Sequence, residues 1–166
     1  MGYKLLALLL YRRALPDGAK WWLFGDDVES DAEVFTLFGD VCAGLRGEAL
    51  AARLREHRVR KETSLSIVDL ADSVSITGNP IEAIFIHLEY GGDPKQIVGP
   101  KVVATHSYLQ TALVLRERGR IVEGAIGAVV QELRRRGVPE TKLPGSQDAV
   151  ARLGIADRCW KWSRHP

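Results

Sequence analysis

The sequence has few cysteines and no long apolar run, which argues against a disulfide-stabilised protein and against a membrane-spanning one. Its two cysteines, Cys42 and Cys159, lie far apart without metal-site spacing, so we expect reduced thiols and no disulfide framework. The leucine-rich run at residues 5–10 is too short to cross a bilayer, and no small-residue cleavage site follows it. We therefore expect a cytoplasmic protein without a transmembrane segment.

Several motifs of nucleotide-binding and metal-binding proteins are also missing. The chain has no Gly-x-x-x-x-Gly-Lys-Ser/Thr loop, and Gly124 and Gly127 lie inside a helical pattern instead of a dinucleotide-binding turn. These absences argue against a P-loop hydrolase and a dinucleotide-binding site. The histidines show no ligand spacing with one another or with the cysteines: His57, His87, His106 and His165.

The size and charge of the chain fit a single domain with an ordinary core. At 166 residues it is long enough to bury a core without disulfides or metals. The net charge is only +2, but residues 1–99 hold 11 basic and 15 acidic side chains, whereas residues 100–166 hold 12 and 6. The basic second half could attract phosphate-bearing partners, although solvated helix faces are the simpler explanation.

Apolar periodicity predicts helices that alternate with strands. This order favours an α/β, Rossmann-like fold with a mainly parallel sheet flanked by helices. The continuous apolar run at residues 20–24 predicts a strand buried on both faces. The other expected strands are residues 65–70 and 83–88, and the expected helices are residues 3–14, 31–38 continuing toward Cys42, 47–57, 107–117 with Ser107 as its cap, 121–136 and 146–153.

An acidic loop follows the first predicted strand and is the most informative segment. Gly25 permits a sharp turn, and Asp26 and Asp27 then stand at the carboxyl end of the strand, where sites of parallel sheets form. Asp31 can return from the next helix toward the same place. Clustered carboxylates repel one another unless a cation lies among them, and Mg²⁺ is a suitable occupant. A simpler alternative is that Asp27 or Ser30 only caps that helix.

The same segment resembles motifs III and IV of the haloacid dehalogenase superfamily, most closely its phosphatidate-phosphatase-like members. The resemblance rests on Lys4 opening a helix, a Pro-Asp turn, an apolar strand and the pattern Gly-Asp-x-x-x-x-Asp. It implies a magnesium-dependent phosphomonoester hydrolase that acts through an aspartyl-phosphate. Asp26 would then ligate Mg²⁺ with Asp27 as a second metal candidate, while Asp31 and Lys4 would be the catalytic residues. Lys20 is an alternative candidate for the role given to Lys4, but it precedes the strand and should lie at the opposite edge of the sheet.

The resemblance also implies a domain organisation. Residues 1–122 would form the haloacid dehalogenase-like portion, with an insertion at about residues 44–80, and residues 123–166 a helical extension packed on it. The expected substrate is a phosphorylated small molecule or a lipid head group. Basic residues of the insertion could line an entrance for that anion, or could simply be solvated: Arg53, Arg55, Arg58, Arg60 and Lys61.

The Asp-x-Asp nucleophile motif of that family is missing, and so is the Ser/Thr motif that binds the phosphoryl group. Asp69 and Asp72 have the wrong spacing to replace it. The chain would therefore be a half-site. It could be the C-terminal part of a longer protein, could be completed by a partner chain, or could be a degenerate domain. Because the missing half would supply the central strand, strand 21–24 would expose an edge, and we expect a homo-oligomer or a partner chain.

A different function is suggested by the C-terminal region. The arginine run at residues 134–136 and the Trp-Lys-Trp segment at residues 160–162 could bind nucleic acid or an acidic protein partner, which would make the chain an inactive binding module. Helix-dipole preference and docking on the core explain the same residues more simply. Under the phosphatase interpretation we expect no nucleic-acid partner.

Overall fold

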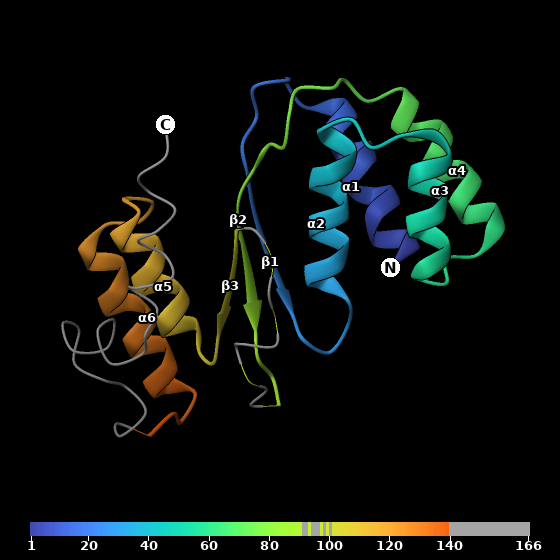
Figure 1. Ribbon diagram of the computed structural model, residues 1–166. Coiled ribbons are helices and arrows are strands. Elements are labelled where there is room, and N and C mark those ends of the chain that lie inside the picture. The colour runs from blue at the N-terminus through green and yellow to red at the C-terminus, as the bar shows by residue number, and fades with distance from the viewer. Residues whose placement is uncertain (91–92, 94–96, 98, 100, 140–166) are drawn as a thin grey trace. The chain divides into compact units, whose positions relative to one another are not determined.

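The computed structural model describes residues 1–90, 93, 97, 99 and 101–139 and has an α/β architecture (Figure 1). Its three-stranded sheet has the order β1-β2-β3, with β1 and β2 parallel, and helices flank it. The predicted α/β class is confirmed. The described elements are α1 (Gly2–Ala14), β1 (Trp21–Asp26), α2 (Asp31–Cys42), α3 (Gly47–Glu56), α4 (Lys61–Asp72), β2 (Ile81–His87), β3 (Val102–Thr105), α5 (Tyr108–Glu117) and α6 (Glu123–Arg135).

The chain divides into two compact units, residues 1–102 and 103–166. The division expected at residues 122/123 falls between α5 and α6, which pack on each other. None of the helices that the structure describes has the length and apolarity needed to cross a membrane. The helix expected at residues 146–153, Cys159 and the Trp-Lys-Trp segment lie outside the described residues.

Strand β1 is less buried than its apolar sequence predicts. It pairs with β2 from Trp21 opposite Ile81 to Asp26 opposite His87, and β2 is its one strand neighbour in the described part of the chain. Phe24 is 56% exposed, so the prediction of burial on both faces is wrong. The strand lies at the border of the described sheet, and Phe24 stacks on Phe85 of β2 with ring centroids 5.2 Å apart.

The core of the first unit lies between the sheet and the helices. Leu5 and Leu9, four residues apart on one face of α1, are fully buried. Trp21 packs edge-to-face on Phe38 of α2, with ring centroids 5.0 Å apart, which fixes α2 against the sheet. Cys42 is a free thiol in this core, and burial raises its pKa, as for an inert structural cysteine.

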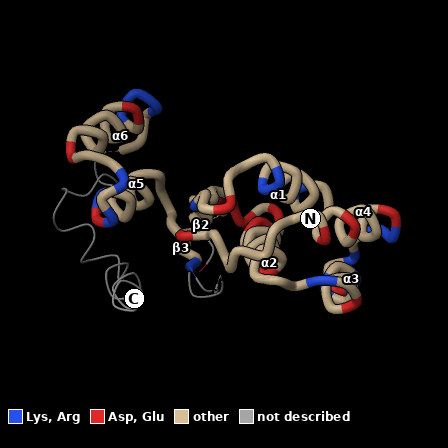
Figure 2. The backbone as a smooth tube through the Cα atoms, turned by 90° about the horizontal axis from the view of Figure 1, so that it is seen from above, with Lys and Arg blue, Asp and Glu red and all other residues tan. Residues whose placement is uncertain are grey.

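The predicted insertion forms a pair of helices, and the strand expected at residues 65–70 is wrong because these residues belong to α4. Ile67 and Ala71 are buried and stand four residues apart, which is helical spacing, whereas Leu65 is 57% exposed. Helix α3, whose Leu50 and Leu54 are buried, packs on α4, and α4 also packs on α1. Basic and acidic positions are interspersed along α3 and α4 (Figure 2).

The second unit contains β3 and the helices α5 and α6. The predicted cap of α5 is confirmed, because Ser107 Oγ accepts a hydrogen bond from the backbone N–H of Gln110 at 3.3 Å. Strand β3 was not predicted, since four residues after a Gly-Pro turn give too short a pattern. Apolar residues of both helices form one cluster: Leu109, Ala112, Leu113 and Ile126, with Ile121, Val129, Val130 and Leu133 packed against them.

Candidate functional site

Lys4, Asp26 and Asp31 meet at the carboxyl end of β1, where the sequence predicts a site. Asp31 is 5% exposed, and its Oδ2 accepts a hydrogen bond from the backbone N–H of Asp26 at 3.3 Å. Lys4 Nζ donates to the other carboxylate oxygen, Asp31 Oδ1. One carboxylate therefore joins the start of α1, the end of β1 and the start of α2.

Gly25 is required by the close approach of Asp31 to the strand. A Cβ atom at position 25 would lie 2.6 Å from Asp31 Cβ and 2.8 Å from Asp31 Cγ. The expected reason for this glycine, a sharp turn, is wrong, because its φ is not in the left-handed region and it lies within β1. Because Gly25 has no side chain, the Asp31 carboxylate has room to lie against the strand.

Lys4 is held between two carboxylates. Besides Asp31, it contacts Glu29 Oε2 at 2.8 Å, and its side chain is 38% exposed. The hydrogen bond to Asp31, followed by that to Glu29, raises the pKa of Lys4 above its ordinary value, while burial opposes the shift. Lys4 therefore carries a full positive charge at neutral pH, in a fixed position at the sheet edge.

The Asp26 carboxylate stabilises its own loop through one oxygen and leaves the other open. Asp26 Oδ1 accepts hydrogen bonds from the backbone N–H groups of Val28, at 3.0 Å, and Glu29, at 3.4 Å. Such side-chain turns are usual for aspartate. Asp26 Oδ2 has no hydrogen-bond donor among the described residues, so it can accept a cation.

Asp27 connects the loop to β2. Its backbone N–H donates to the carbonyl of His87 at 3.1 Å, and its Oδ1 accepts from the backbone N–H of Glu89 at 2.8 Å. Ser30, not Asp27, occupies the cap position of α2, and neither side chain caps the helix. Within the described ranges no group of three acidic, histidine or cysteine side chains is placed to hold a metal. The open oxygen of Asp26 fits only part of a magnesium site, and Asp27 as a ligand stays a prediction.

Lys20, Asp69 and Asp72 lie away from this cluster, whereas His87 is opposite Asp26 in the register of β1 and β2. Lys20 precedes β1, at the opposite end of the strand from Asp26. Asp69 and Asp72 belong to α4, so they do not follow a strand, and Asp72 lies 4.0 Å from Arg46. His87 lies at the end of β2 with its Nε2 atom 4.0 Å from Glu89 Oε1, too far for a hydrogen bond.

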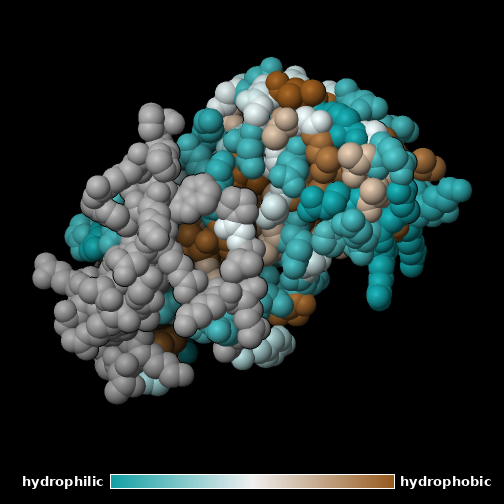
Figure 3. Space-filling model, viewed as in Figure 1, coloured by the Kyte–Doolittle hydropathy of each residue, from teal (hydrophilic) through white to brown (hydrophobic). Residues whose placement is uncertain are grey.

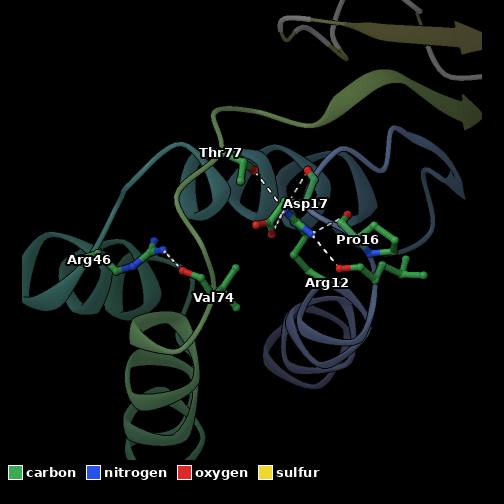
Figure 4. Close-up of polar contacts among 7 residues, drawn as sticks. Arg12, Pro16, Asp17, Arg46, Val74 and Thr77 are labelled. Carbon is green, nitrogen blue, oxygen red and sulfur yellow. Dashed lines mark hydrogen bonds and ion pairs between the residues drawn. The ribbon is translucent and has the colours of Figure 1, made fainter.

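A buried arginine at the other end of α1 was missed by the sequence analysis. Arg12 is 1% exposed and lies on the same helix face as Leu5 and Leu9, a spacing that could have revealed it. Nη1 donates to the carbonyls of Leu15 and Pro16 at 3.3 and 3.2 Å, and Nη2 donates to Asp17 O, Asp17 Oδ1 and Thr77 Oγ1 at 3.0–3.1 Å (Figure 4).

The arginines of α6 are largely engaged with one acid. Arg135 and Arg136 each donate to Glu132 at 2.7 Å, and these hydrogen bonds, Arg135 first, lower the pKa of Glu132 to about 2. Their charge is partly neutralised on the helix surface. No described contact therefore favours the nucleic-acid or acidic-partner alternative.

Comparison of the chain with known proteins gave no match. No family model, curated protein or solved structure is significantly similar to it. The geometry of the site and the chemistry of its residues therefore carry the functional argument.

Proposed function

We propose that this chain carries half of a magnesium-dependent phosphomonoester hydrolase site of the haloacid dehalogenase type, without its Asp-x-Asp nucleophile. The observation that carries the proposal is the contact of Lys4 with Asp31, and of Asp31 with the backbone of Asp26, at the carboxyl end of a parallel strand. These residues have the spacing of the third and fourth motifs of that family. The start of α1, the end of β1 and the start of α2 bring these three charged residues together.

Each residue has a distinct role in the proposed site. Lys4 would stabilise the negative charge that a phosphoryl group carries during transfer, and Asp31 would hold its ammonium in place. The open oxygen of Asp26 would bind Mg²⁺, with Asp27 as a further candidate. Mg²⁺ would supply charge neutralisation when bound. The substrate would be a phosphorylated small molecule or a lipid head group such as phosphatidate.

A missing half would also explain why Phe24 on β1 is 56% exposed. Figure 3 shows hydrophobic side chains at the surface of the first unit among hydrophilic ones. A strand added beside β1, from a second copy, a partner or a longer form of the chain, would cover part of this surface. Large exposed apolar side chains within residues 3–28 are Tyr3, Leu10, Tyr11, Leu15, Phe24 and Val28.

Magnesium binding tests the proposed role of Asp26. We expect calorimetric titration with MgCl₂ to show weaker binding in the Asp26→Asn variant than in the parent, because the open oxygen loses its charge. Asp69→Asn, an exposed acid of α4, is the matched control and should bind as the parent does. Equal magnesium affinity in the parent and Asp26→Asn would refute the assignment, provided that both unfold at the same denaturant concentration.

The proposed open edge is tested by sedimentation. We expect the purified chain to self-associate at micromolar concentration. A monodisperse monomer under these conditions would contradict the expectation of an uncovered strand edge.

A further inference from the structure

Strand β1 directs one row of its backbone groups away from β2. The backbone N–H groups of Trp21 and Asp27 donate to carbonyls at or beside the two ends of β2. Because successive residues of a strand point their backbone groups to opposite sides, those of Trp22, Phe24 and Asp26 face away from β2. Since β2 is the one strand neighbour of β1 in the described part of the chain, this side is an edge of the described sheet.

The C-terminal end of this edge is closed by Asp31, whose carboxylate accepts the backbone N–H of Asp26 at 3.3 Å. An added strand would therefore pair with the backbone of Trp22 and Phe24. A second copy of β1 that runs antiparallel to the first meets this requirement. With a two-fold axis at Leu23, Trp22 of each copy lies opposite Phe24 of the other, and both pairs are of the hydrogen-bonded type.

The same register brings aromatic side chains together. Trp22 and Phe24 both stack on Phe85 of β2, with ring centroids 6.0 and 5.2 Å away. Trp21 packs on α2, so Trp22 and Phe24 lie on the opposite face of the sheet, where Phe24 is 56% exposed. Contact of Trp22 with Phe24 of the second copy, made twice, would bury this aromatic surface.

The N-terminal end of β1 is positively charged. Lys20 precedes the strand, is exposed and forms no ion pair with any residue that the structure describes. Lys101 lies nearby, where its Nζ donates to the carbonyl of Ile81. Burial, followed by the charge of Lys20, lowers the pKa of Lys101, while Glu82 opposes the shift. A carboxylate brought to this end would relieve the repulsion between the two lysines.

The C-terminal end of β1 is negatively charged. Lys4 lies between two of its acids, and the others keep the excess of negative charge. The acids of this acidic loop and of the helix start that follows it are Asp26, Asp27, Glu29 and Asp31. Antiparallel pairing about Leu23 sets Lys20 of one copy opposite Asp26 of the other, whereas parallel pairing would set like charges side by side.

We propose that two copies of this chain pair antiparallel through β1, with Trp22 of each copy opposite Phe24 of the other. The pairing joins the described sheets of the two copies into one. It also brings Lys20 of each copy to the acidic loop of the other, so the candidate site receives a cation from the second copy. The pairing follows from the edge of β1 and does not depend on the proposed hydrolase chemistry.

Sedimentation equilibrium of the full chain at micromolar concentration tests the pairing, and the parent should form a dimer. Phe24→Lys should weaken the dimer by more than about tenfold, because it removes both aromatic contacts and adds a charge at the strand edge. Tyr11→Lys changes an exposed aromatic residue of α1 in the same way and should dimerise as the parent does. A monomeric parent, or equal dissociation constants in the two variants, would overturn the proposal.

A charge reversal tests which ends of the strands meet. Lys20→Glu should weaken the dimer about fivefold, because two surface charge pairs become repulsive. Arg13→Glu makes the same change of charge at an exposed position of α1 and is the matched control. Equal dissociation constants in these two variants would contradict the placement of Lys20 at the acidic loop.

Disulfide formation tests the register. In a Cys159→Ser background, a mixture of Trp22→Cys and Phe24→Cys copies should cross-link on oxidation, since Cα atoms of a directly opposite pair lie about 5.5 Å apart. Phe24→Cys alone should cross-link much less, because diagonal positions are about 7–8 Å apart. Cross-linking of Phe24→Cys alone, without the mixed product, would overturn the register. Weaker magnesium binding by Asp26→Asn beside a failed pairing would leave the proposed function standing.

Discussion

The two ends of α1 each place a cation in a polar network, and the networks differ in kind. Arg12, at the C-terminal end, is 1% exposed, and its guanidinium donates to backbone carbonyls and to Asp17 and Thr77 side chains nearby. Lys4, at the N-terminal end, has a side chain that is 38% exposed and lies between two carboxylates.

This difference separates a structural arginine from a candidate site lysine. The carbonyls around Arg12 follow the end of a helix and form a turn, and they satisfy the donors of a guanidinium that is itself buried. The carboxylates around Lys4 are those of Asp31 and Glu29, and Asp31 also accepts a hydrogen bond from the backbone N–H of Asp26 at the end of β1. Local folding accounts for the first arrangement, and the proposed function would give the second arrangement a role.

Replacing Arg12 should have the largest effect on stability. We expect Arg12→Met to lower the free energy of unfolding by about 3 kcal/mol, because carbonyls of the 15–17 turn and Thr77 lose buried donors. Urea unfolding measures the change. Arg13→Met is the matched control, since Arg13 is exposed, and should change stability by less than about 0.5 kcal/mol. Similar losses of unfolding free energy in the two variants would contradict a structural role for Arg12.

Gly25→Ala should have the next largest effect, about 2 kcal/mol, because the added methyl group overlaps the buried Asp31 side chain. Gly18→Ala is the control, because nothing lies within 4 Å of a Cβ atom there. Thermal unfolding compares the two variants. An unchanged midpoint in Gly25→Ala would mean that Asp31 does not approach the strand as described.

Lys4→Met should destabilise the chain by about 1 kcal/mol, less than Arg12→Met, because the carboxylate it leaves still accepts the Asp26 N–H. The same urea unfolding series measures it. A loss as large as that of Arg12→Met would contradict the contrast between the two ends of α1.

The smallest effect concerns pH. Because the folded pKa of Lys4 is raised above 10.5, its ion pairs contribute full stability below that value, and the contribution is lost as the pH rises through the raised pKa. The stability difference between the parent and Lys4→Met should therefore shrink in alkaline solution. Urea unfolding at neutral pH and near pH 11 measures this difference; a constant difference would show that the lysine pKa is not raised.

The sequence predicted much of this site because its signals were local. The apolar run before Gly25 and the acids after it placed a strand end and a helix start, and parallel pairing brings such ends to one edge. Three features depended on tertiary packing and were missed or misjudged. They are the helical state of residues 65–70, the burial of Arg12, and the exposure of Phe24 at the border of the sheet.

Magnesium-dependent hydrolysis of an aryl phosphate by the purified chain tests the central claim most directly, with Asp26→Asn measured alongside. Because a phosphatase of this type needs an aspartate nucleophile, we predict no hydrolysis above background in either protein. Hydrolysis by the parent that Asp26→Asn loses would contradict the half-site, since it would require a nucleophile within this chain.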